Sequence, residues 1–239
     1  MEETVQLRPF PMIWKSISWI ILYFALQILV VLIPVAVMVA RDPSLAGTLG
    51  DDLATFAILA MWSINLASAI TILLIWFNVK KEGRADKIGL FAPSKIPLIQ
   101  TLGLGVALLG VSYGLTWVYS TYIIPGVDMQ GEIKALLAAL PKTPIYFLLQ
   151  FVAVAIAAPI VEELLFRGYL QTSLTTRFGA PVAILLASFL FALVHMQPYA
   201  IPALMLIGLT FGYLYHRTGS LKVNIALHVV NNGLALAFS

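Results

Sequence analysis

Long apolar runs separated by short polar segments make up most of the chain. A run of about 17 residues or more is long enough to cross a bilayer as a helix. The pattern predicts seven such helices, at residues 16–40, 54–79, 98–123, 144–166, 181–197, 200–216 and 221–238. The expected fold class is therefore an all-α polytopic membrane protein with one membrane domain. We expect residues 1–143 to form an N-terminal cytoplasmic segment and the first three spans, and residues 144–239 to form a helical core.

Composition supports a membrane protein and excludes several other classes. Hydrophobic residues make up 61% of the chain and charged residues only 10%, against about 25% charged in a soluble domain. The sequence has no cysteine, which excludes disulfides, thiolate metal ligands and a cysteine nucleophile. The net charge of +3 is spread over loops rather than gathered on one face. We therefore expect the lipid bilayer as a partner and no nucleic acid.

The charges between the apolar runs predict an orientation. Arg8 and Lys15 precede the first run, and the loop after it is acidic. The next loop is the most basic, with Lys80, Lys81, Arg84, Lys87 and Lys95. Because cytoplasmic loops carry an excess of lysine and arginine, the alternation places the N-terminus in the cytoplasm and the C-terminus outside. We expect the protein in the plasma membrane.

Two adjacent carboxylates stand inside the fourth apolar run. A charged side chain in hydrocarbon costs roughly 2.5–3.5 kcal/mol on insertion scales, so Glu162 and Glu163 mark a candidate functional site. Glu163 and Arg167 are four residues apart and can pair on one helix face. Glu162 points about 100° away and suits a general base. A structural salt bridge between helices is the alternative.

Two further motifs bring polar groups into the later runs. The fourth helix should continue past the carboxylates and end at Gly179, so that Glu162 and His195 meet at similar depth on antiparallel neighbours. His228 and Asn232 are one turn apart and share a face. Taken alone, a histidine at a helix end is more often a packing residue, and a buried asparagine often joins helices.

Small residues four apart suggest packing faces rather than chemistry. Gly110 and Gly114 flank Ser112, but the Gly-x-Ser-x-Gly elbow requires a strand and turn that this apolar run does not offer. We expect the Gly110–Gly114 pair, like the Gly208–Gly212 pair, to allow close helix packing.

Three motifs occur in order along the chain: Glu-Glu-x-x-x-Arg at 162–167, Phe-x-x-x-His at 191–195 and His-x-x-x-Asn at 228–232. Together they resemble the CPBP family, which comprises CAAX-prenyl-protease-like and bacteriocin-processing (Abi) membrane proteins. The resemblance covers about residues 144–239 and makes them the catalytic core of an intramembrane endopeptidase. It implies that Glu162 and His195 activate water, that His228 and Asn232 stabilise the oxyanion, and that Glu163 and Arg167 support the site.

The cofactor and the substrate stay open at this stage. Members of the family are described as metalloproteases or as glutamate proteases; a divalent metal such as zinc would be held by Glu162, His195 and His228, but no spacing demands it. The implied substrate is a membrane-associated peptide or protein, prenylated in one branch. Two alternatives are a non-catalytic bacteriocin-immunity or scaffolding protein and a proton-coupled transporter; the absence of an inverted repeat disfavours the transporter.

Overall fold

The computed structural model describes residues 10–44, 52–80 and 84–237. Within these ranges all regular structure is helical and there is no strand, which confirms the all-α prediction. Arg8 and Lys81, which entered the orientation argument, lie outside the described residues.

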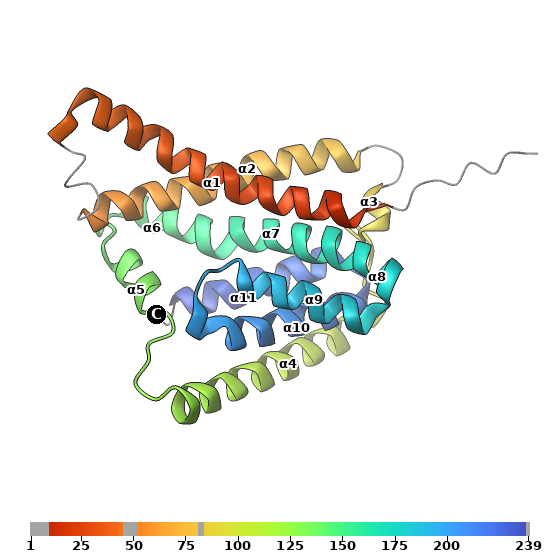
Figure 1. Cartoon of the computed structure of the whole chain (residues 1–239). Helices are drawn as coiled ribbons and strands as arrows, with labels where there is room; N and C mark the ends of the chain where they lie inside the picture. Colours follow the sequence, from red (N-terminus) through yellow and green to blue (C-terminus); the bar gives the residue numbers. More distant parts are fainter. Residues whose placement is uncertain (1–9, 45–51, 81–83, 238–239) are drawn as a thin grey trace, which may run out of the picture.

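The helices form one bundle (Figure 1). Its first half contains α1 (Ile13–Arg41), α2 (Leu53–Val79), the short α3 (Arg84–Lys87), α4 (Leu98–Val118) with the π-helical turn η2 (Tyr119–Ile123), and the short α5 (Gly131–Ala138). Its second half contains one long helix made of α6 (Pro144–Phe151), η3 (Val152–Ala157), α7 (Ala158–Glu162), η4 (Glu163–Gln171) and α8 (Thr172–Phe178), followed by α9 (Ala180–Leu193), η5 (Pro198–Ala200), α10 (Ile201–Thr218) and α11 (Leu221–Ala237).

In the described part of the chain, five helices are long and apolar enough to cross a membrane: Ile13–Arg41, Leu53–Val79, Leu98–Ile123, Pro144–Phe178 and Pro198–Thr218. The other two predicted spans correspond to α9 with 14 residues and α11 with 17. At about 1.5 Å per residue, α9 reaches only about 21 Å, less than the roughly 30 Å of a hydrocarbon core. The predicted number of seven spanning helices is therefore not confirmed.

The end of α9 differs from the prediction. The helix stops at Leu193, four residues before the expected end at residue 197. Met196 has a positive φ of 56°, a backbone conformation that a helix does not use. Pro198 then opens the short helix η5. His195 consequently lies in the turn after α9 rather than on the helix.

The long helix from Pro144 to Phe178 continues past the carboxylates, as predicted. It ends at Gly179, whose φ of 80° breaks the helix, and Pro181 occupies the first turn of α9. On both sides of Pro159 the helix is π-helical, in η3 and in η4. Such stretches are frequent at functional sites, and here the second begins at Glu163.

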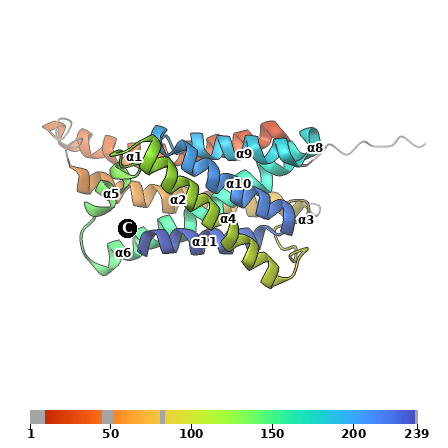
Figure 2. The same ribbon diagram turned by 90° about the horizontal axis from the view of Figure 1, so that it is seen from below.

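The long helix occupies the centre of the bundle. It lies between the α1–α2 pair and the group formed by α9, α10 and α11 (Figure 1). Its residues from Glu163 to Gln171 are all buried, and several belong to the main hydrophobic core. Figure 2 shows α4 lying across α10, at the edge of the bundle. The two glutamates are therefore held at mid-length in the most enclosed helix.

Candidate active site

Glu163 is the best-connected side chain of the site. It is fully buried, and its Oε1 accepts hydrogen bonds from Arg167 Nη1 at 2.9 Å and His228 Nδ1 at 2.8 Å. Its Oε2 accepts a hydrogen bond from Asn224 Nδ2 at 2.7 Å. The pairing of Glu163 with Arg167 confirms the prediction from their spacing. With three donors on its two oxygens, this carboxylate is committed to holding its neighbours.

Arg167 is almost fully buried and connects the long helix to α10. Its Nη2 donates to the carbonyl oxygen of Gly208 at 3.0 Å, while Nη1 holds Glu163. The guanidinium lies over the ring of Phe191, 4.8 Å from its centre, and 5.8 Å from that of Phe211. A buried charge requires this kind of pairing, because an uncompensated ion in a low dielectric is strongly destabilising.

Glu162 has a different environment from its neighbour. Its side chain keeps 17% of its surface exposed, and its Oε2 lies 3.7 Å from His228 Nε2. That separation is longer than a hydrogen bond. The adjacent carboxylates are thus unlike: Glu163 is enclosed and fully bonded, whereas Glu162 accepts no hydrogen bond from the described residues and remains partly exposed.

His228 stands between the two glutamates. A carboxylate oxygen only accepts, so the contact with Glu163 places a proton on His228 Nδ1 and leaves Nε2 facing Glu162. The ring stacks on Phe211 with 4.4 Å between ring centres. The orientation and the plane of the ring are therefore fixed by its neighbours.

The hydrogen bond of His195 is with the end of α9 rather than with a glutamate. No hydrogen bond or ion pair joins it to Glu162 among the described residues, and the carboxylate partner of Glu162 is His228 instead. The depth estimate for His195 assumed a continuous helix, whereas α9 ends two residues before it; that Glu162 and His195 act together stays a prediction. His195 Nδ1 donates to the carbonyl oxygen of Phe191 at 2.6 Å, which leaves Nε2 as a free acceptor.

Phe191 links the two histidines. Its ring centre lies 4.7 Å from that of His195 and 6.4 Å from that of His228. The side chain is buried and also touches Phe166 edge-on at 5.3 Å. The Phe-x-x-x-His motif therefore places an aromatic ring in contact with both imidazoles and with the guanidinium of Arg167.

Asn232 lies one turn beyond His228 on α11. Its Nδ2 donates to the carbonyl oxygen of Val154 on η3 at 3.1 Å, and its Oδ1 accepts from Asn231 Nδ2 at 3.2 Å. Neither contact is with a glutamate. Direct contacts thus join Glu162, Glu163, Arg167 and His228 into one cluster. The hydrogen bonds of His195 and Asn232 are with other residues.

Asn224 is a residue of this cluster that the sequence analysis missed. It is fully buried and donates to Glu163 Oε2 and, at 2.9 Å, to the carbonyl oxygen of Phe211. Its Oδ1 has no hydrogen-bond partner. The signal was present as Asn-x-x-x-His-x-x-x-Asn at 224, 228 and 232, since residues four apart share one helix face.

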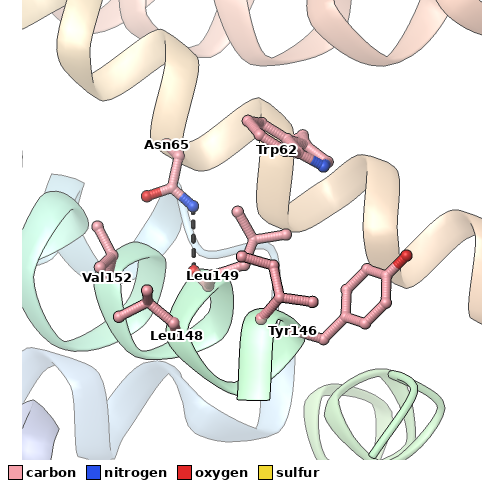
Figure 3. A pocket seen from close by; sticks show the side chains of 7 residues that line it. Trp62, Asn65, Tyr146, Leu148, Leu149 and Val152 are labelled. Atoms are coloured by element: carbon pink, nitrogen blue, oxygen red, sulfur yellow. Dashed lines mark hydrogen bonds between the residues drawn. The ribbon is translucent and has the colours of Figure 1, made fainter. Parts of the chain in front are cut away.

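A pocket elsewhere in the bundle does not belong to this cluster. It has a volume of about 320 Å³ and is lined by Trp62, Asn65, Ile145, Tyr146, Leu148, Leu149 and Val152. Figure 3 shows Asn65 pointing from α2 towards the long helix, where its Nδ2 donates to the carbonyl oxygen of Leu149 at 3.1 Å. None of the six predicted site residues lines the pocket, so its size carries no argument about the chemistry.

The described residues do not fit a zinc site with three protein ligands. No group of three or more histidine, aspartate or glutamate side chains in these ranges is close enough to hold a metal ion. Glu162, His195 and His228, the expected ligands, do not form such a group. In addition, the Nδ1 atoms of both histidines are already engaged.

Comparisons with known proteins agree on one family. Residues 144–234 match the family model of Rce1-like type II CAAX prenyl endopeptidases, and this segment contains all six predicted site residues. Over these residues, which make up less than half of the chain, the sequence is similar to the Rce1-like CAAX protease family. The resemblance drawn from the three motifs is thereby confirmed.

Two curated relatives extend the similarity beyond the matched segment. The chain is 26% identical over 232 residues to the membrane-embedded CAAX protease MroQ of Staphylococcus aureus (strain USA300), covering 95% of this chain and 89% of that protein. It is 29% identical over 179 residues to the membrane peptidase YdiL of Bacillus subtilis (strain 168), covering 72% and 68%. No solved structure matches. The family and these relatives support a membrane protease.

Proposed function

We propose that this protein is an intramembrane endopeptidase that hydrolyses a peptide bond with a water activated by Glu162. The observation that carries the proposal is the unlike pair of adjacent glutamates. Both oxygens of Glu163 are occupied by hydrogen bonds from Arg167, His228 and Asn224, so this carboxylate orients its neighbours. Glu162 has free oxygens, partial exposure and a histidine nitrogen nearby. A general base needs such an accessible acceptor.

In the proposed reaction Glu162 takes a proton from water as the water oxygen bonds to the carbonyl carbon. His195 helps Glu162 to activate the water and does so through Nε2, because its Nδ1 donates to the carbonyl oxygen of Phe191. The carbonyl oxygen becomes an oxyanion that accepts hydrogen bonds from His228 Nε2 and Asn232 Nδ2. Collapse of the intermediate breaks the C–N bond, and Glu162 passes its proton to the leaving amine.

The geometry of His228 favours it as an oxyanion donor. Its ring is held by Glu163 at Nδ1 and stacks on Phe211, and its Nε2 faces Glu162. Donation to the oxyanion requires a proton on Nε2 as well as the one on Nδ1. Preorganised donors of this kind supply much of the rate enhancement in acyl transfer.

The proposed substrate is a membrane-associated peptide or protein. The bundle places the cluster at mid-length in the central helix, so a substrate approaches laterally from the bilayer or from the cytoplasmic side. A prenylated peptide is the first substrate to test, because the matching family model and MroQ carry the CAAX name.

The test compares cells that carry wild-type protein, Glu162→Gln or Glu132→Gln at equal abundance. Glu132 is an exposed residue of α5 and provides a matched control. Membrane proteomics with mapping of peptide termini should show uncleaved precursors with Glu162→Gln only. Identical termini in all three strains would contradict the proposal.

A non-catalytic scaffold is the second candidate, and one observation favours it. The Glu163 cluster joins the long helix to α11 through Asn224 and His228, and Arg167 extends it to α10. Such a network alone could hold the bundle together. Glu162 lies outside those hydrogen bonds, so a scaffold would keep its biological effect with Glu162→Gln whereas a protease would not.

We further propose that catalysis is of the glutamate type. The support is the ligand geometry, since the described acids and histidines do not gather around one point. Cleavage by purified protein should continue at its full rate after rigorous chelation. Loss of cleavage that zinc restores would instead assign the metallo-endopeptidase subtype.

A further inference from the structure

A side chain from outside the matched family segment reaches the site. Tyr113 lies on α4, and its hydroxyl donates to Oδ1 of Asn231 at 2.8 Å. Asn231 is buried on α11 beside Asn232. One residue before Tyr113, the hydroxyl of Ser112 is 2.7 Å from that of Thr210 on α10. This contact fixes the register of α4, so the position of Tyr113 is set by the fold.

The hydrogen bond from Tyr113 begins a chain that ends at Asn232. Because Oδ1 of Asn231 accepts from Tyr113, its Nδ2 is directed the other way and donates to Oδ1 of Asn232 at 3.2 Å. Nδ2 of Asn232 then donates one proton to the carbonyl oxygen of Val154 at 3.1 Å. An amide nitrogen carries two protons, so one stays free on the Asn232 side chain.

We propose that Tyr113 is a positioning residue for the hydrolysis, acting through Asn231 to set the amide of Asn232. The inference rests on the proposed function. With the chain, the Asn232 amide is held at both ends, at Oδ1 by Asn231 and at Nδ2 by Val154. Without it, only the contact with Val154 remains and the amide can swing about that hydrogen bond. When the chain of hydrogen bonds is intact, the second proton on Nδ2 of Asn232 points to the oxyanion. The N-terminal helices thereby contribute to the chemistry as well as to the bundle.

The test is Tyr113→Phe, which removes one oxygen atom and keeps the ring. Tyr122→Phe is the matched control, since Tyr122 is exposed in η2 and its ring contacts Trp117. The substrate is the precursor identified with Glu162→Gln, prepared as a synthetic peptide in detergent micelles. We expect kcat to fall about tenfold with KM unchanged. Loss of an oxyanion donor itself typically costs about 10²–10³ in kcat, and disorder of a donor costs less.

Asn231→Asp provides a second variant. It keeps an acceptor for Tyr113 but removes the donor to Asn232, so kcat should fall as it does with Tyr113→Phe. Combining the two changes should add little, because both interrupt one chain. This pair keeps the test decisive if either single variant accumulates poorly.

The values of kcat and KM for Tyr113→Phe decide the positioning role. Wild-type kcat in Tyr113→Phe, or a raised KM at unchanged kcat, would overturn the positioning role. If wild type and Glu162→Gln behave alike, the proposed function fails and this inference falls with it. If wild type cleaves, Glu162→Gln does not, and Tyr113→Phe equals wild type, only the role of Tyr113 is wrong.

Discussion

His228 Nδ1 lies 2.8 Å from Oε1 of Glu163, so one carboxylate of the adjacent pair orients the histidine. The same oxygen accepts from Arg167. Glu162 approaches the histidine only at 3.7 Å, from the side of Nε2. The two acids therefore differ in what their loss should do: Glu163 is tied to stability and Glu162 to turnover.

Glu163→Gln and Glu162→Gln should separate these effects. The first removes the charge that balances a fully buried Arg167, and breaking a buried ion pair in this way costs about 3–5 kcal/mol. The second touches no hydrogen bond of the cluster. In thermal unfolding in detergent we expect a clear fall in Tm for Glu163→Gln and a Tm close to wild type for Glu162→Gln, with both inactive. Equal Tm values for the two variants would contradict the division.

Asn224 should matter as much as the motif residues. Asn224→Ala leaves Oε2 of Glu163 without its donor, and an unsatisfied buried acceptor costs about 1–3 kcal/mol. Asn224→Asp should be worse, because it places a second carboxylate against the first. Lys222→Ala, at an exposed position of the same helix, is the control. Stability and cleavage should be highest for the control, lower for Asn224→Ala and lowest for Asn224→Asp. An Asn224→Asp variant as stable as wild type would show that the contact of Asn224 with Glu163 does not stabilise the protein.

The long helix and its ion pair could be predicted from the sequence. Spacing alone predicted that Glu163 and Arg167 pair and that the helix runs to Gly179. Residues four apart on one helix are neighbours whatever surrounds them, and a glycine next to a proline marks a helix end locally. These features depend on nearby residues only.

The spacing of residues along one helix did not predict the partners of Glu163 on α11, Asn224 and His228. In a bilayer the lipid-facing and core-facing sides of a helix are both apolar, so the hydrophobic pattern does not show which faces meet. Asn224 was overlooked, and the contact of His228 with both glutamates was not predicted. The expected close packing at Gly110 and Gly114 was wrong for the same reason, since both face open space.

The orientation of the protein in the membrane is a further prediction. At one end of the bundle, the segment that follows α3 is joined to the turn between α10 and α11 by the hydrogen bond from Ser220 Oγ to the carbonyl oxygen of Ala92 at 2.6 Å. Arg84 and Lys87 belong to α3, Lys95 to the segment after it, and Lys222 to the first turn of α11. The end of α11 lies at the opposite end (Figure 1). By the positive-inside rule, the basic end faces the cytoplasm and the C-terminus lies outside.

Reporter fusions test this orientation. A reporter that is active only in the cytoplasm should be inactive at the C-terminus and active at the N-terminus. A periplasmic or extracellular reporter should give the reverse pattern. Cytoplasmic activity at the C-terminus would invert the orientation or imply an even number of crossings.

Gly208 and Gly110 form a matched pair for the packing of α10. A Cβ at Gly208 would lie 2.9 Å from Ser188 Cβ and 3.0 Å from its Cα, so α9 and α10 would have to separate. Overpacking of this kind costs about 1–3 kcal/mol. The carbonyl of Gly208 also accepts from Arg167, so Gly208→Ala should lower both Tm and cleavage. Gly110→Ala meets no atom within 4 Å and should leave both unchanged or raise Tm, since alanine favours a helix by up to about 1 kcal/mol. Should Gly208→Ala match Gly110→Ala in both measurements, α10 would not be held against α9 as tightly as the contacts imply, and Arg167 would not depend on that distance.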